Sequence, residues 1–106
     1  MKKDSKTFTN LKEACEYKGK EKVIYNGNAD FKDTGIVDLG NLEEISGNAD
    51  FRDSIVADLG KLKTIGGNAY FWDSKVTDLG KLKTIGGHAY FRDSRVSEAD
   101  QRRFKN

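Results

Sequence analysis

The sequence predicts a mainly β protein: a right-handed parallel β-solenoid of four 20-residue coils with capped ends. Residues 27–106 divide into four blocks of 20 residues, and the second and third blocks are identical at 16 positions. A repeat of this length predicts stacked coils, each of which buries its apolar side chains against its neighbours. The apolar residues recur at the same places in the blocks, and right-handed winding is expected because parallel crossover connections nearly always have that hand.

Each block carries an Ala-x-Phe pair at its third and fifth positions, and this spacing of two predicts a short strand with both side chains in the core. Further apolar residues follow at intervals of three, as in Val56, Leu59, Leu62 and Ile65. Intervals of three fit neither a long helix nor a long flat strand, so they predict a chain that turns corners around one axis. Glycines are expected to supply positive φ angles at these corners. These glycines are Gly40, Gly47, Gly60, Gly66, Gly67, Gly80, Gly86 and Gly87.

Residues 1–106 are expected to form a single domain, in which residues 27–96 are the repeat coils and residues 1–26 are an N-terminal cap. Asn10 followed by Glu13 has the pattern of a helix N-cap. This capping helix is expected to end at Gly19. Its buried face would carry Leu11, Ala14, Cys15 and the stem of Lys18. A strand at 23–25 would lead into the first coil.

The last residues, 97–106, are expected to close the other end of the solenoid. The leucine and isoleucine columns become Ala99, Arg102 and Lys105 in the fourth block, as a terminal cap requires. Ser97 with Asp100 three residues later predicts a short helix here. Phe104 is expected to fold back over the final layer.

The runs LGNLEEISGNADF and LGKLKTIGGNAYF resemble the LxNLxxIxG pattern of leucine-rich-repeat proteins, especially receptor L-domain-like repeats. The resemblance covers about 80 of the 106 residues. It implies a solenoid that serves as a binding scaffold, and it implies no particular activity. The coils are at the short end of that family and carry the unusual Ala-x-Phe strand. The Lys/Asn/Asp/Ile-rich repeats also resemble, in style, small proteins of bacterial phages and mobile elements.

The composition excludes several functional classes. The net charge is +2, and no apolar run approaches the roughly 20 residues that a membrane span needs. The lone cysteine, Cys15, leaves no internal disulfide and fits a reducing compartment, so a cytoplasmic location is expected. With one histidine and one cysteine, the chain offers no Ser/His/Asp, Cys/His or zinc cluster, and it has no phosphate-binding glycine loop. We expect no enzyme activity, cofactor or metal.

Two polar columns leave alternatives open. Asp33, Asp53, Asp73 and Asp93 recur at the end of each Ala-x-Phe strand, where their carboxylates would form Asx-turns. The same column is a weaker candidate for a row of calcium ligands. A second column precedes the strand and predicts a stacked ladder of amides that ends in a candidate contact residue. Its members are Asn28, Asn48, Asn68 and His88.

The outward positions of the Ala-x-Phe strands carry the candidate site. The residue between alanine and phenylalanine is Asp30 and Asp50 in the first two blocks but Tyr70 and Tyr90 in the last two. Tyrosine, tryptophan and arginine are enriched in binding hot spots, and these positions do not build the core. The candidate partner-binding residues are Tyr70, Trp72, Tyr90, Arg92, Arg52, His88, Lys75 and Arg95. Simple stabilisation of an exposed sheet by cross-strand aromatic pairs is the alternative.

Two functional classes follow from this surface. The first is a non-catalytic module, expected to be monomeric, that binds a protein partner and acts as its stoichiometric inhibitor. The phage-like style implies a concrete version, an anti-defence or anti-CRISPR protein acting on a bacterial effector nuclease or its RNA complex. The alternative is an RNA or single-stranded nucleic-acid binder, with stacking on the aromatic rings and phosphates on the basic side chains. Its phosphate contacts would be Arg52, Lys75, Arg92 and Arg95.

Overall fold

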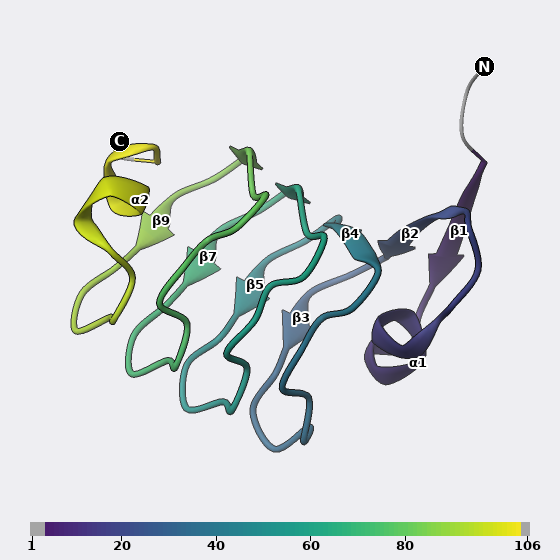
Figure 1. Ribbon diagram of the computed structural model, residues 1–106, viewed down its shortest axis with the longest axis horizontal. Helices are drawn as coiled ribbons and strands as arrows, with labels where there is room; N and C mark the ends of the chain where they lie inside the picture. The colour runs from purple at the N-terminus through teal and green to yellow at the C-terminus, as the bar shows by residue number, and fades with distance from the viewer. Residues whose placement is uncertain (1–3, 105–106) are drawn as a thin grey trace.

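The computed structural model describes residues 4–104, which form a parallel β-solenoid of about four coils (Figure 1). Five strands form one sheet, in the order β1 (Ser5–Phe8), β2 (Lys22–Tyr25), β4 (Leu42–Ile45), β6 (Thr64–Ile65) and β8 (Thr84–Ile85). Four short strands form the other sheet: β3 (Ala29–Asp30), β5 (Ala49–Asp50), β7 (Ala69–Tyr70) and β9 (Ala89–Tyr90). All of these pairings are parallel, which confirms the predicted fold class.

The coils are joined by hydrogen bonds that repeat every 20 residues. In the four-stranded sheet, the backbone N–H of Ala29 donates to the carbonyl of Asn48 at 2.8 Å, and the equivalent bond from Ala49 to Asn68 is also 2.8 Å. The strands pair alanine with alanine, so each side chain lies on its own copy in the next coil. This register is the structural consequence of the sequence repeat.

The core consists of stacked layers, as the apolar columns predict. Phe31, Phe51 and Phe71 are completely buried, and Phe91 packs against the same core but is only partly buried. Their ring centroids are 4.8, 5.1 and 5.3 Å apart along the stack, with nearly parallel planes. A narrow core, in which each coil contributes one layer of side chains, therefore runs along the solenoid. This explains how a chain with 36% hydrophobic residues forms a core.

The prediction for the glycines is right at one corner and wrong at the other. Gly40, Gly60 and Gly80 have φ angles of 59°, 57° and 56°. The later glycines, such as Gly66 and Gly86, do not have positive φ; there, a Cβ atom would collide with a backbone carbonyl of the preceding coil. Close approach between coils, and not the φ angle, therefore requires glycine at these positions.

The N-terminal cap contains helix α1 (Leu11–Glu16), and the side chain of Asn10 accepts the N–H of Glu13 at 3.0 Å as predicted. The helix ends at Glu16 and not at Gly19, so the expectation for Lys18 is wrong: this residue lies beyond the helix and is exposed. Strand β1, which pairs with β2, was not predicted. Cys15 is buried, and burial followed by the nearby charges of Asp38 and Glu16 raises the pKa of its thiol to about 12.

Helix α2 (Glu98–Arg102) forms the C-terminal cap at the predicted place (Figure 1). Ser97 caps its first turn, and Asp100 accepts the backbone N–H of Leu79 at 2.9 Å, which fastens the helix to the preceding coil. Phe104 packs against the core, as expected. Lys105 lies outside the described residues. Within the described part of the chain, no helix is long and apolar enough to cross a membrane.

Candidate partner-binding face

The two faces of the four-stranded sheet separate core from surface. In the second coil, Ala49 and Phe51 are fully buried, whereas the alternate residues Asp50 and Arg52 are partly exposed. Trp72 occupies the same outward position as Arg52, one coil later. This alternation follows from the period of a β-strand and places the side chains of Arg52 and Trp72 on the outer face.

Three aromatic rings form a cluster on this outer face. Tyr70 and Tyr90 stack with centroids 5.1 Å apart and planes within 3° of parallel. Trp72 is tilted against both, at 5.9 Å from Tyr70 and 5.6 Å from Tyr90. His88 lies 6.1 Å from the Tyr90 ring, at the edge of the cluster. Tyr70, Trp72 and Tyr90 are thus in mutual ring contact, and His88 adjoins the cluster through Tyr90.

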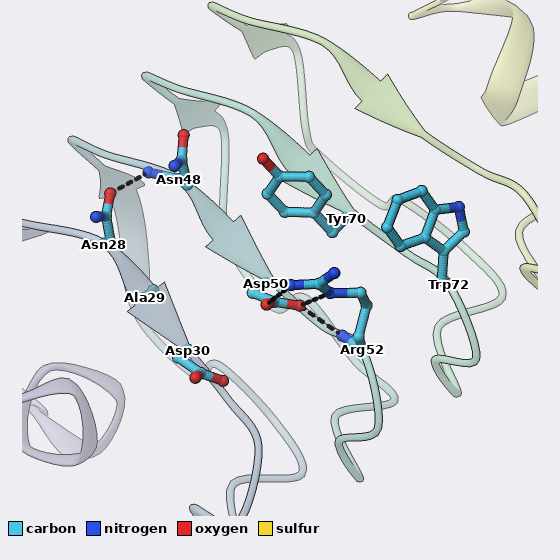
Figure 2. A pocket seen from close by; sticks show the side chains of 8 residues that line it. All are labelled: Asn28, Ala29, Asp30, Asn48, Asp50, Arg52, Tyr70 and Trp72. Carbon is cyan, nitrogen blue, oxygen red and sulfur yellow. Dashed lines mark hydrogen bonds and ion pairs between the residues drawn. The ribbon is translucent and has the colours of Figure 1, made fainter.

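Arg52 joins this cluster through an ion pair within its own coil. Its Nε donates to Asp50 Oδ1 at 2.9 Å, and its Nη2 to Oδ2 at 2.6 Å (Figure 2). The guanidinium carbon then lies 4.9 Å from the centroid of Tyr70 and 5.3 Å from that of Trp72, within cation–π range. Partial burial raises the pKa of the Asp50 carboxyl, but the hydrogen bonds from Arg52 outweigh this, so its pKa is lowered.

The remaining candidates lie at the margin of the cluster or outside it. Arg92 has a side chain that is 85% exposed, with Nε 3.8 Å from a carboxylate oxygen of Asp93. It shares with Arg52 and Trp72 a hollow of about 300 Å³, whose other lining residues are Asp53, Asp73 and Asp93. Lys75 and Arg95 are exposed, and no ring contact or ion pair joins them to the aromatic cluster in residues 4–104. We call the set that the structure brings together the aromatic–arginine face: Arg52, Tyr70, Trp72, His88, Tyr90 and Arg92.

The aspartate column adopts a left-handed backbone conformation. Asp33, Asp53, Asp73 and Asp93 have φ angles between 48° and 59°, a region that aspartate enters more readily than most residues. The Asx-turns are elsewhere: carboxylates such as Asp38 and Asp58 accept N–H bonds from the glycine two residues later. Among the described residues, no group of three or more His, Cys, Asp or Glu side chains is arranged to hold a metal ion.

The asparagine column forms a ladder, but its bonds differ from those predicted. The side-chain oxygen of Asn28 accepts the backbone N–H of Asn48 at 2.9 Å, and Asn48 and Asn68 repeat this bond to the next coil at 2.8 Å. Each amide therefore bonds the following main chain and not another amide. His88 ends the ladder because no further coil follows it in the structure.

A hollow in front of the aromatic rings was not predicted. It has a volume of about 470 Å³ and lies over the first two strands of the four-stranded sheet (Figure 2). We call it the Asp30 hollow. Its lining residues are Asn28, Ala29, Asp30, Asn48, Asp50, Arg52, Tyr70 and Trp72. The change from a short to a long side chain between Asp50 and Tyr70 was its only sequence signal.

Comparison of the chain with protein-family models, curated proteins and solved structures finds no significant match. Function is therefore inferred from the geometry of this face.

Proposed function

We propose that this protein is a non-catalytic module that binds a partner protein through its aromatic–arginine face. The observation that carries the proposal is the cluster of Tyr70, Trp72 and Tyr90 at positions that the fold does not require to be aromatic. Asp30 and Asp50 occupy the tyrosine position in the first two coils, with the same strand register. Clustered tyrosine, tryptophan and arginine side chains are typical of binding hot spots.

The indole of Trp72 supports a role beyond stability. Its N–H group is buried and has no hydrogen-bond acceptor within residues 4–104. A buried donor without a partner costs about 1–3 kcal/mol. A ring retained only to stabilise the sheet is expected to have this group hydrogen-bonded or in water, so we take its cost to support a binding role for Trp72.

The more specific form of the proposal is a stoichiometric inhibitor that occupies the surface of a larger protein. The resemblance to leucine-rich and receptor L-domain-like repeats supports a binding scaffold, and the phage-like style of the repeats supports an anti-defence or anti-CRISPR role in the bacterial cytoplasm. A target of that type would be an effector nuclease or its RNA complex. The stacked core supports a rigid binding surface, since each coil is hydrogen-bonded to the next.

A nucleic-acid partner fits the charges of the face less well. Arg52 is already paired with Asp50, and Arg92 lies beside Asp93. The hollow between these arginines is also lined by Asp53 and Asp73, whose carboxylates would repel phosphates. RNA binding is the alternative outcome of the test below, because it would weaken steeply with added salt.

The test is a double variant, Trp72→Ala with Tyr90→Ala, used in affinity capture from a bacterial lysate. We expect the protein enriched by the wild type to be lost with this variant and retained with Lys81→Ala/Lys83→Ala, which changes two exposed lysines just before β8 of the five-stranded sheet. Circular dichroism should show that both variants are folded, with stacking losses on the order of 1–2 kcal/mol for the aromatic pair. Capture that is equal for wild type and Trp72→Ala/Tyr90→Ala would refute the proposal. A salt-sensitive shift of bare RNA would favour the alternative.

A further inference from the structure

The aromatic column on the outer face continues into the second coil by means of an arginine. The Tyr90 and Tyr70 rings are 5.1 Å apart, and the Arg52 guanidinium carbon lies 4.9 Å from the Tyr70 ring centroid. Asp50 is too short to reach this column, but it holds the Arg52 guanidinium there through two hydrogen bonds. From the fourth coil to the second, the column therefore consists of the Tyr90 ring, the Tyr70 ring and the Arg52 guanidinium.

The same place in the first coil lacks such a group. Asp30 pairs in register with Asp50, and the backbone N–H of Lys32 donates to Asp30 Oδ1 at 3.0 Å, as that of Arg52 does to Asp50. The Lys32 side chain, however, is exposed and forms no ion pair with Asp30 in the described residues. The position over Asp30 is part of the Asp30 hollow (Figure 2).

The charges in the hollow favour a cation. Its lining contains two carboxylates, Asp30 and Asp50, and one guanidinium, that of Arg52. The Asp50 carboxylate is satisfied by Arg52, whereas Asp30 accepts one backbone N–H and is exposed. Lys32 and Arg52 lie close enough to act electrostatically on these carboxylates, but among residues 4–104 no cationic side chain forms an ion pair with Asp30.

We propose that the Asp30 hollow receives an arginine side chain of the partner protein, an inference that rests on the proposed function. The incoming guanidinium would bind Asp30 through two hydrogen bonds, as Arg52 binds Asp50, and extend the column by one member. Arginine fits better than lysine because its planar, forked donors match a carboxylate and its flat face stacks on a neighbouring planar group. Repulsion from Arg52 is offset by the two carboxylates beneath the pair.

The first experiment titrates the intact protein with N-acetyl-arginine methylamide and follows backbone amide signals by NMR. We expect saturable shifts at Asp30, Arg52 and Tyr70 in the millimolar range. The uncharged citrulline analogue and the Asp30→Asn variant should each bind about tenfold more weakly or not at all, since the charged hydrogen bonds are lost. Absent shifts, or equal binding of the citrulline analogue, would overturn the inference. So would tighter binding of N-acetyl-tyrosine methylamide.

The decisive variant fills the hollow from within the chain. Because the backbone of Lys32 is placed like that of Arg52, Lys32→Arg should pair with Asp30 and block the hollow without altering any residue of the aromatic–arginine face. Lys32→Ala is the matched control and should leave arginine binding intact or slightly stronger. Arginine binding to Lys32→Arg as tight as to the wild type would contradict the inference.

Capture of the partner separates this inference from the proposed function. Loss of capture with Lys32→Arg, but not with Lys32→Ala, supports both. Capture that needs Trp72 and Tyr90 but is unchanged by Lys32→Arg overturns the arginine hollow and leaves the proposed function in place. Conversely, arginine binding in the hollow together with normal capture by the Trp72→Ala/Tyr90→Ala variant refutes the proposed function and supports the hollow as a guanidinium site.

Discussion

On the inner face of the four-stranded sheet, every coil carries the same two side chains, an alanine and a phenylalanine. On the outer face, the first two coils carry aspartate where the last two carry tyrosine. The two faces share one backbone, so the difference does not come from the fold. Inside, each side chain must fit its own copy at about 5 Å, whereas outside it meets solvent and a change of residue is tolerated. Positions with the same residue in every coil therefore belong to the core, and the position that changes from aspartate to tyrosine belongs to the candidate site.

The largest effect is expected on the inner face. Phe51 is completely buried between Phe31 and Phe71, with ring centroids 4.8 and 5.1 Å away. We expect Phe51→Ala to lower the free energy of unfolding by about 3–5 kcal/mol because it leaves a cavity in the middle of the stack. Urea unfolding measures this loss, and Trp72→Ala on the outer face should lose clearly less. Equal losses for the two variants would break the comparison between the faces.

A smaller effect is expected where neighbouring coils approach each other most closely. A Cβ atom on Gly66 would collide with the carbonyl of Ser46 in the preceding coil. We expect Gly66→Ala to force the coils apart and to destabilise the fold by about 1–3 kcal/mol. Thermal unfolding measures the effect, with Thr64→Ala, at a partly exposed site of the same coil, as the control. An unchanged melting temperature for Gly66→Ala would show that the spacing between coils is not fixed by backbone contact.

The smallest effect is expected for the ion pair of the outer face. The folded pKa of Asp50 is lowered, so its stabilisation is present above the unfolded value of about 3.9 and is lost as pH falls through the folded pKa. Asp50→Asn should therefore lower the free energy of unfolding at pH 7 by less than about 1 kcal/mol, because the pair is partly exposed. Urea unfolding of wild type and variant should converge at pH values below the folded pKa. A difference that persists in acid would show that Asp50 stabilises the fold by another route.

The core was predictable from the sequence because the same apolar residues recur at the same positions in successive coils. Because Phe31, Phe51 and Phe71 are 20 residues apart, pairing neighbouring coils with a 20-residue offset places each core residue against its equivalent in the next coil. The helix N-caps at Asn10 and Ser97 were predictable for a local reason, since a side-chain acceptor meets a free N–H three residues later. Strand β1 was missed because residues 5–8 lie before the repeat and are stabilised by pairing with β2, which the sequence does not show.

The outer face was predictable only as a set of side chains. Their alternation with the core residues indicated Tyr70, Trp72 and Tyr90 as neighbours, and the structure brings them together. The conformation of the Arg52 side chain was not predictable. Conformations in which this long, flexible side chain contacts solvent, Asp50 or the rings differ little in free energy. The Asp30 hollow exists because the Arg52 side chain pairs with Asp50, whereas the Lys32 side chain forms no ion pair with Asp30 in the described residues.

The hydrogen bonds between coils also bear on the size of the molecule. The N–H groups of Ala69 and Phe71 donate to the fourth coil, while those of Ala89 and Phe91 have no acceptor within residues 4–104. Nothing in a middle coil specifies how many others precede or follow it, so the count is set where the helices close the stack. Inserting a copy of one 20-residue block between the third and fourth blocks would add a coil without creating a new kind of contact. The scaffold is in this sense extendable. A chain with more coils, joined by the same contacts, would present a longer outer face for binding.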